Sequence, residues 1–313
     1  MKVTFKPKEL KTTLFIDWEI NYNCNYRCSY CVTYETGWNK TSFSKALTAF
    51  DNLYHSVIKN SSLPVMIWFS GGEPSILPWF TDFCLYIKGI DPNIRLSMTS
   101  NGSQPFELYD NLLEQNILYS ITFSLHFEFA KPEHFLKKIM RLYDKYGHLD
   151  RGLEKFSIIV MYEKQATELA AKIMQELKEK DIKTSTHLIR HEKQEESKES
   201  KEFVLKTYNS NLNDVSLNDV MFYNSNYVLD LMYTNKFSFK GWNCWAGVHR
   251  FFISKDFDLS AGSCGIKTFG NLLTDDIQFD NQPVICDGRS CICTANIKVK
   301  KEIEYAKNLK IFE

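Results

Sequence analysis

The sequence has no long hydrophobic run, and this absence excludes one class of protein. No stretch reaches the roughly 18 consecutive apolar residues that a membrane-spanning helix needs, and residues 1–8 lack the apolar core of a signal peptide. No charge of one sign is in excess either, because 38 basic residues stand against 38 acidic ones. The basic footprint of a general nucleic-acid binder is therefore missing. We expect a cytoplasmic protein that binds neither membranes nor nucleic acids in general.

Disulfide bonds are also not expected, although the chain has nine cysteines, because no export signal directs it out of a reducing compartment. Three of the cysteines, Cys24, Cys28 and Cys31, lie on one short stretch with gaps of three and two residues. Structural zinc needs four protein ligands, and the next candidates, His55 and Cys84, are far along the chain. Three thiolates on a cubane iron–sulfur cluster would leave one iron open, unlike the ferredoxin arrangements. A zinc knuckle or three incidental thiols is the alternative.

Strand-like and helix-like segments alternate over the first 190 residues. The apolar patterns predict strands at residues 14–22, 65–69, 94–99, 119–125, 156–161 and 182–189. Helical spacing is predicted between them at residues 41–59, 75–89, 106–115, 132–146 and 164–180. Alternation of this kind is typical of βαβ units and a parallel sheet, so we predict an α/β protein with a partial (β/α)6 TIM-like barrel.

Polar motifs follow the predicted strands, where barrel enzymes carry their active residues. Glycine lets a backbone approach a ligand closely, and a carboxylate can pair with an ammonium group. Ordinary turns, and a histidine satisfied beneath a loop, are the simpler interpretation of the same residues. The candidate binding residues at these strand ends are Gly71, Gly72, Glu73, Pro74, Ser100, Asn101, Ser124 and His126.

The cysteine stretch, with Tyr30 before its third cysteine, resembles the radical S-adenosylmethionine (radical SAM) superfamily. The Gly-Gly-Glu-Pro motif after the second predicted strand matches that family's second hallmark. The resemblance implies a [4Fe-4S] cluster on Cys24, Cys28 and Cys31, with S-adenosyl-L-methionine chelating the fourth iron. It also implies that the strand-end residues contact this cofactor. A reductase such as flavodoxin or ferredoxin would supply the electron that cleaves the cofactor to a 5′-deoxyadenosyl radical.

A second group of cysteines follows a charge-rich run at residues 191–202, which predicts a solvated linker. This group resembles the small cysteine-rich C-terminal twitch/SPASM-like extension of some radical SAM enzymes, and five cysteines favour one auxiliary iron–sulfur cluster, which we expect to be [4Fe-4S]. Zinc on four of the same thiols is the alternative. We expect the barrel at residues 1–190, a linker and connecting segment at 191–240 and the auxiliary-cluster domain at 241–313. The candidate ligands are Cys244, Cys264, Cys286, Cys291 and Cys293.

The resemblance predicts an oxidoreductase-type radical SAM enzyme that abstracts a hydrogen atom from its substrate. The substrate is expected to be a peptide or protein, with the auxiliary cluster accepting an electron. The alternative is a dehydrogenase of a small polyol or amino sugar. A non-catalytic iron–sulfur electron carrier or zinc-binding protein is the alternative from another class, and it leaves the strand-end motifs to coincidence.

Overall fold

The computed structural model describes residues 3–5, 13–31, 41–147, 156–162, 166–180, 182, 184–188, 238–279, 281–288, 291 and 299–303. The chain forms two compact units, and the boundary between them falls within strands β2 (Leu14–Asn21) and β3 (Val65–Gly71). One unit, here the cysteine-loop unit, comprises Glu19–Phe43 and Trp68–Asn209. The other, here the terminal unit, comprises Met1–Trp18, Ser44–Ile67 and Ser210–Glu313.

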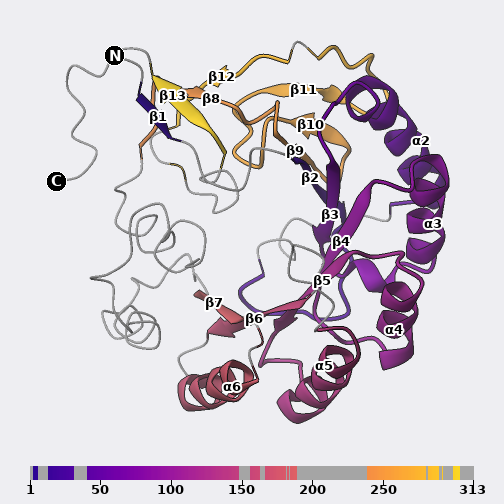
Figure 1. Ribbon diagram of the computed structural model, residues 1–313, viewed down its shortest axis with the longest axis vertical. Coiled ribbons are helices and arrows are strands. Elements are labelled where there is room, and N and C mark those ends of the chain that lie inside the picture. Colours follow the sequence, from indigo (N-terminus) through magenta and orange to yellow (C-terminus); the bar gives the residue numbers. More distant parts are fainter. Residues whose placement is uncertain are drawn as a thin grey trace. The chain divides into compact units, whose positions relative to one another are not determined.

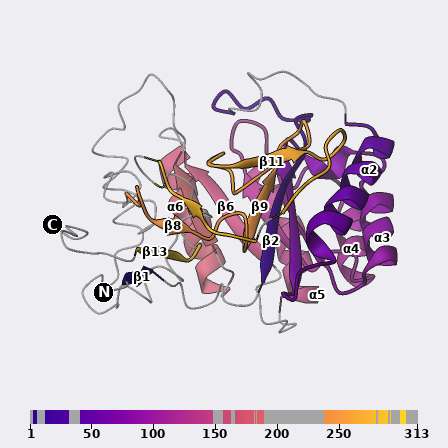
Figure 2. The ribbon, with the colours of Figure 1, turned by 90° about the horizontal axis from the view of Figure 1, so that it is seen from above.

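The cysteine-loop unit is an α/β structure in which strands follow one another in sequence order from β2 to β7. After β3 come β4 (Arg95–Ser100), β5 (Ser120–Leu125), β6 (Phe156–Tyr162) and β7 (Thr184–Leu188). Strands β4 to β7 pair in parallel. The connecting helices, on the outer side of these strands in Figures 1 and 2, are α3 (Phe80–Ile90), α4 (Phe106–Glu114), α5 (Pro132–Tyr146) and α6 (Thr167–Glu179). The predicted α/β class with a parallel sheet is therefore confirmed.

The central strands of this unit carry apolar residues because they are buried in its core. Every residue of β5 is buried, as expected for a strand of a parallel sheet that is covered on both faces. Helix α5 buries one apolar stripe at helical spacing, made of Phe135, Ile139, Leu142 and Tyr146. The Phe123 ring of β5 packs edge-on against Tyr109 at 5.1 Å between ring centroids.

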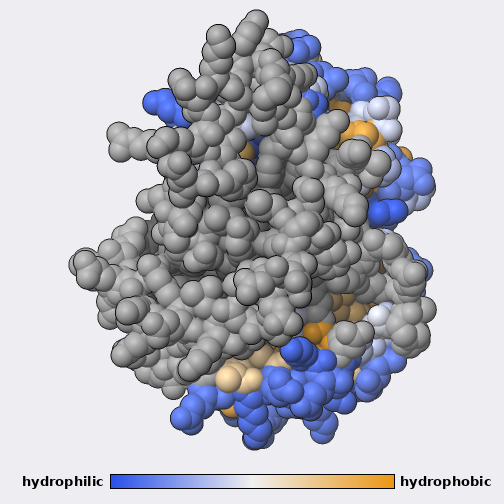
Figure 3. Space-filling model, turned by 60° about the vertical axis from the view of Figure 1, so that its left-hand side comes forward, coloured by the Kyte–Doolittle hydropathy of each residue, from blue (hydrophilic) through white to orange (hydrophobic). Residues whose placement is uncertain are grey.

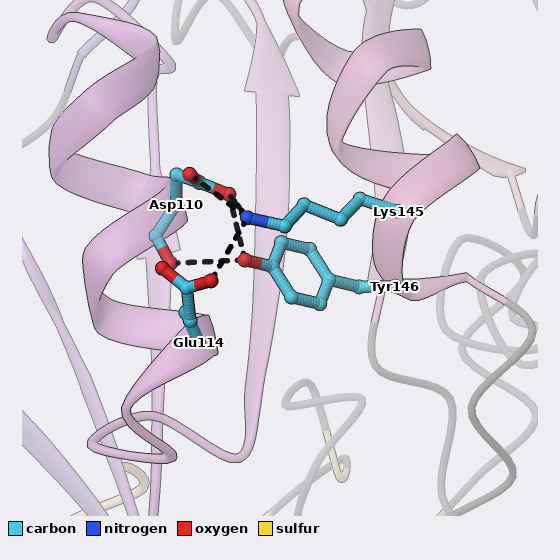
Figure 4. Close-up of polar contacts among 4 residues, drawn as sticks. All are labelled: Asp110, Glu114, Lys145 and Tyr146. Carbon is cyan, nitrogen blue, oxygen red and sulfur yellow. Dashed lines mark hydrogen bonds and ion pairs between the residues drawn. The ribbon is translucent and has the colours of Figure 1, made fainter.

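Helices α4 and α5 are also joined by a polar cluster near their C-terminal ends (Figure 4). Lys145 Nζ lies 2.9 Å from Asp110 Oδ1 and 3.3 Å from Glu114 Oε1, and Tyr146 Oη donates to Asp110 Oδ1 at 2.6 Å. Burial alone would raise the pKa of Asp110, but the hydrogen bonds from Tyr146 and Lys145 outweigh it and lower the pKa. Exposed ion pairs of this kind add little stability individually.

The terminal unit contains a small antiparallel sheet in the order β1-β13-β8-β12. These strands are β1 (Val3–Phe5), β13 (Lys301–Ile303), β8 (Asn243–Cys244) and β12 (Val284–Ile285). A hairpin is formed by β9 (Arg250–Ile253) and β10 (Asp258–Ser260), and β11 (Thr268–Asn271) follows it. Its strand β9 pairs in parallel with β2, from Phe15↔Arg250 to Trp18↔Ile253.

Two predicted helices have different bounds in the structure. The segment predicted as one helix at residues 41–59 is α2 (Phe43–Leu53) followed by a π-helical turn, Tyr54–Ile58. The helix predicted from residue 75 is preceded by a short 3-10 turn, Pro74–Ile76, and begins at Phe80. Pro78 lies between the two, and a proline disfavours helical backbone at the residue before it.

The described surface carries scattered rather than extended hydrophobic side chains. Figure 3 shows one face on which the visible described residues are mainly hydrophilic and the hydrophobic ones form small areas. No helix within the described ranges combines the length and apolar character needed to cross a bilayer. The domain boundaries expected from the sequence stay a prediction, because most of the segment 191–240 lies outside the described residues.

Candidate functional site

The loop at the carboxyl end of β2 carries Cys24, Cys28 and Cys31, which are thiols rather than disulfides. Cys28 is 5% exposed, and a backbone hydrogen bond of 3.0 Å from Cys31 N to its carbonyl oxygen closes the turn. Burial raises the pKa of Cys24, and it raises the pKa of Cys28 to about 12. The charges of the neighbouring thiols raise both values further, so the three sulfur atoms act on one another electrostatically.

Gly71, the last residue of β3, and Gly72 let the end of this strand lie directly against the start of the cysteine loop. A Cβ on Gly71 would stand 2.1 Å from the carbonyl oxygen of Asn21, and one on Gly72 would stand 2.1 Å from that of Asn23. In their place run two backbone hydrogen bonds of 2.8 Å, from Gly72 N to Asn21 O and from Glu73 N to Asn23 O. Gly71 also has φ +113°, which only glycine adopts readily. Within the described residues, the close approach that these two glycines allow is therefore one between two backbone segments of this chain.

Glu73 is a buried carboxylate, 1% exposed, that holds the ends of β3 and β4 together. Its Oε1 accepts hydrogen bonds from Ser75 N (3.1 Å), Ser75 Oγ (2.5 Å) and Ser100 Oγ (2.9 Å). Its Oε2 accepts one from Asn101 N at 2.6 Å. Burial raises the pKa of this carboxyl, and the hydrogen bonds oppose the shift. Four donors of the chain thus occupy the carboxylate that the sequence predicts as a partner for the cofactor's ammonium; that contact stays a prediction.

Asn101 links this carboxylate to the cysteine loop. While its backbone N–H donates to Glu73, its side-chain Nδ2 points to Cys24 Sγ at 3.6 Å and to Asn25 Oδ1 at 2.9 Å. The backbone N–H of Tyr26 points to the same Cys24 sulfur at 3.3 Å. Hydrogen bonds to thiolate sulfur are one of the features that tune iron–sulfur clusters. The end of β4 therefore lies against the cysteine loop, while the predicted contact of Ser100 and Asn101 with the cofactor stays a prediction.

The turn after β5 contacts the cysteine loop at three points. His126 Nδ1 lies 2.9 Å from Tyr30 Oη and 3.6 Å from Cys28 Sγ. Glu128 accepts hydrogen bonds from Ser29 N, at 2.7 Å, and from Ser29 Oγ. The rings of Phe129 and Tyr26 stack at 5.4 Å between centroids. We call these contacts, made by His126, Glu128 and Phe129, the loop clamp.

The structure therefore brings most of the predicted strand-end residues together around one loop. Pro74 and Ser75 are buried in the 3-10 turn beside Glu73, and Ser124 is buried in β5 two residues before His126. Sequence reasoning missed Glu128 and Phe129. The only signal was their position just after His126, at the end of a strand.

Two buried acceptors at the start of the loop have no hydrogen-bond donor within the described ranges. They are Oδ1 of Asn21 and Oδ1 of Asn23, and Asn21 Nδ2 donates to the carbonyl oxygens of Asn23 and Glu73 at 3.2 and 3.4 Å. A buried acceptor without a donor costs free energy. These oxygens fit a bound group that presents N–H donors, such as an ammonium.

The C-terminal cysteines that the structure describes belong to the terminal unit. Cys244 of β8 is buried with Ala246, Ala261 and Val284, and Cys286 packs against this cluster. Burial raises the pKa of Cys286, and the charges of Cys244 and Cys264 raise it further, so both of these thiols lie within electrostatic reach of Cys286. Cys291 is half-buried, and Cys293 lies outside the described residues.

Within the described ranges, no three His, Cys, Asp or Glu side chains already surround one point as ligands of a metal ion. A single metal ion needs its ligands around one point, whereas the thiolates of a cubane cluster bind different iron atoms and therefore do not meet at one point.

Fold and site together define the class: an α/β enzyme whose thiol loop leaves the first strand of a parallel sheet and is held by the following strand ends. A family model described as the radical SAM superfamily matches residues 18–204. The chain belongs to the radical SAM superfamily, and membership implies a [4Fe-4S] cluster and S-adenosyl-L-methionine as cofactors. No curated protein matches the chain at a significant level.

Solved structures with a TM-score above 0.5 show the same fold at low sequence identity. The protein anSMEcpe with bound AdoMet and Cp18Cys peptide has a TM-score of 0.54 and 14% identity, over 85% of this chain and 79% of that one. Streptococcus suis SuiB bound to precursor peptide SuiA has a TM-score of 0.52 and 15% identity, over 86% of this chain and 65% of that one. BtrN in complex with AdoMet and 2-DOIA has a TM-score of 0.45 and 15% identity, over 84% and 79%.

Proposed function

We propose that this radical SAM enzyme abstracts a hydrogen atom from a peptide or protein and that an auxiliary iron–sulfur cluster accepts an electron from the substrate. The proposal of hydrogen-atom abstraction rests on one observation, the loop of three thiols that is held by the ends of β3, β4 and β5. Bound on that loop, the cluster and S-adenosyl-L-methionine supply the 5′-deoxyadenosyl radical that removes the hydrogen atom. The cofactors carry this chemistry, and the protein positions them.

The described residues have distinct roles around that centre. Cys24, Cys28 and Cys31 would ligate three irons. Asn101 and the backbone N–H of Tyr26 orient the Cys24 sulfur. The strand ends at residues 71–74 and 100–101 are held together by Glu73, so they would provide a rigid support for the cofactor bound next to the cysteine loop.

The side-chain oxygens of Asn21 and Asn23 are suited to accept from the ammonium of the cofactor's methionine part. They supply acceptors in addition to the carboxylate of Glu73, whose Oε2 accepts one hydrogen bond within the described ranges. Like Ser124 and His126, they are proposed here as residues near the cofactor.

The auxiliary cluster is proposed on Cys244, Cys264 and Cys286, with the fourth ligand from Cys291 or Cys293. Support comes from Cys244 and Cys286, which lie at one apolar cluster, and from the charges of Cys244 and the exposed Cys264, both of which raise the pKa of Cys286. An acceptor there would take up the electron left on the substrate after hydrogen abstraction, while a proton leaves to a base or to water. The net reaction would then be a two-electron oxidation of the substrate.

The peptide substrate is proposed by analogy of fold. Both solved structures with a TM-score above 0.5 named above contain a peptide, but their identities of 14% and 15% establish the fold alone. A small polyol or amino sugar is the alternative substrate. A non-catalytic iron–sulfur electron carrier or zinc-binding protein is the alternative from another class, and zinc on four of the C-terminal thiols is the alternative to the auxiliary cluster.

The test is anaerobic reconstitution with iron, sulfide, a reductant and S-adenosyl-L-methionine. We expect 5′-deoxyadenosine and methionine in equal amounts. The Cys24/Cys28/Cys31→Ala triple variant should form neither, and it should keep roughly four irons if an auxiliary cubane exists. A fully loaded wild-type protein that forms no 5′-deoxyadenosine would contradict the catalytic proposal. Zinc in place of iron in the triple variant would contradict the auxiliary cluster.

The substrate class is tested with short peptides encoded near the gene, against an aminocyclitol. Faster 5′-deoxyadenosine formation with such a peptide, and deuterium transfer from the deuterated peptide into 5′-deoxyadenosine, would support the peptide. Stimulation and transfer with the aminocyclitol alone would favour the alternative.

A further inference from the structure

Lys301 of β13 is a charged residue in the interior of the terminal unit. It is 1% exposed, although lysine is almost never fully buried unless its charge is paired. Its Nζ donates to the carbonyl oxygen of Val299 at 2.9 Å and lies 4.7 Å from the centroid of the Phe239 ring. Both contacts hold the ammonium at a fixed place.

The register of the small sheet places this ammonium on the same face as two of the thiols. Lys301 is directly opposite Cys244 in the antiparallel β13–β8 pair, and Val284 is opposite Cys244 on the other side. Residues directly opposite each other point to the same face, with Cβ atoms about 4.5–5.5 Å apart. Cys286 is two residues beyond Val284 and extends this ladder, because its N–H donates to Trp242 O at 2.8 Å. Side chains two apart along a strand share a face.

Electrostatics agree with this placement. Burial raises the pKa of the Cys286 thiol, the Cys244 charge adds to this shift, and the Lys301 charge opposes it. The surrounding side chains are apolar, including Ala246, Val284 and Val299. Charges interact more strongly in such surroundings than in water.

We infer that Lys301 sets the reduction potential of a metal centre bound by Cys244, Cys264 and Cys286, acting as a fixed positive charge beside it; this rests on the auxiliary cluster of the proposed function. Reduction adds one negative charge to an iron–sulfur cluster, and net charge is one of the determinants of its potential. A positive charge held close by stabilises the reduced form and raises the potential. Lys301 therefore makes the cluster a better electron acceptor.

The test measures one cluster alone. In the Cys24/Cys28/Cys31→Ala background, the remaining iron is titrated with dithionite under anaerobic conditions and followed by electron paramagnetic resonance. We expect Lys301→Met to lower the reduction equilibrium constant by about tenfold or more, which is about 59 mV for a one-electron couple. Lys301→Gln, which keeps a polar end without the charge, should give the same shift, and Lys301→Arg should shift it by less than about threefold.

The neighbouring Lys300→Met variant is the matched control. It removes the same charge one residue away, where Lys300 is 21% exposed and paired with Glu302, and its shift should also stay below about threefold. Equal shifts in Lys301→Met, Lys301→Arg and Lys300→Met, or none in Lys301→Met and Lys301→Gln, would overturn the role of Lys301. Iron content separates the two proposals: a triple variant without iron refutes the auxiliary cluster itself, whereas roughly four irons with an unchanged potential refute only Lys301.

Discussion

Replacing Gly72 with alanine tests the idea that the two glycines at the end of β3 hold the cysteine loop in place. The added Cβ would lie 2.1 Å from the carbonyl oxygen and 2.6 Å from the carbonyl carbon of Asn23. Real Cβ contacts are essentially never below 3.0 Å, so the two backbones must separate by at least 0.9 Å. Since the atoms concerned belong to the backbone, no side-chain rotation relieves the overlap.

The cost follows from the hydrogen bonds beside the clash. Gly72 N→Asn21 O and Glu73 N→Asn23 O are both 2.8 Å long, and a separation of this size takes them to about 3.7 Å, beyond hydrogen-bond distance. Two lost bonds at about 0.5–1.5 kcal/mol each give roughly 1–3 kcal/mol, the same range as overpacking a core. We expect Gly72→Ala to lower the free energy of unfolding by about 2–3 kcal/mol.

Urea unfolding of the apo-protein, followed by circular dichroism, measures this change, and iron content after reconstitution reports on the loop. Gly89→Ala is the control. Gly89 lies within α3 with nothing within 4 Å of its added Cβ, so alanine should stabilise the protein by up to about 1 kcal/mol. A Gly72→Ala protein with the stability and the iron content of the wild type would refute the reasoning.

Three further substitutions test the site and the fold. Burial raises the pKa of Glu73, so the stability of the wild type should fall as the pH rises from about 4.5 through the folded-state pKa, and Glu73→Gln should flatten that dependence in urea titrations. Tyr30→Phe removes the 2.9 Å contact with His126 and should cost about 1 kcal/mol of unfolding free energy; an unchanged value would argue against this contact. The pKa of Asp110 is shifted in the opposite direction to that of Glu73. Burial of Asp110 raises its pKa, but the hydrogen bonds from Tyr146 and Lys145 outweigh burial and lower it. The stability that Asp110 contributes is therefore lost as the pH falls below its ordinary value of 3.8, and the difference between wild type and Asp110→Asn in thermal unfolding should shrink from pH 6 to pH 3 rather than grow.

The local elements of this fold could be predicted wherever the sequence carries its own start and stop signals. Helix α5 has the predicted bounds, Pro132–Tyr146, because a proline opens it and its apolar residues keep helical spacing to the end. The apolar pattern alone extended α3 backwards to residue 75, since periodicity does not register the restriction that Pro78 places on the preceding backbone.

Pairings between distant segments could not be predicted in the same way. Strand β9 forms a hairpin with its neighbour in the chain, β10, but the parallel pairing of β9 with Phe15–Trp18 depends on a register that neither segment encodes by itself. The same holds within the site. Cys24 and Asn101 are predictable as members of motifs, whereas the contact between Ser29 and Glu128 arises only when two loops meet at one edge of the sheet.

The loop clamp has a consequence for how the protein takes up and loses iron. Because Ser29, Tyr30 and Tyr26 are each engaged by the turn after β5, the thiols cannot swing outward for a metal donor unless that turn releases them first. We therefore expect iron release into a chelator and hydrogen–deuterium exchange at residues 126–129 to share one opening rate.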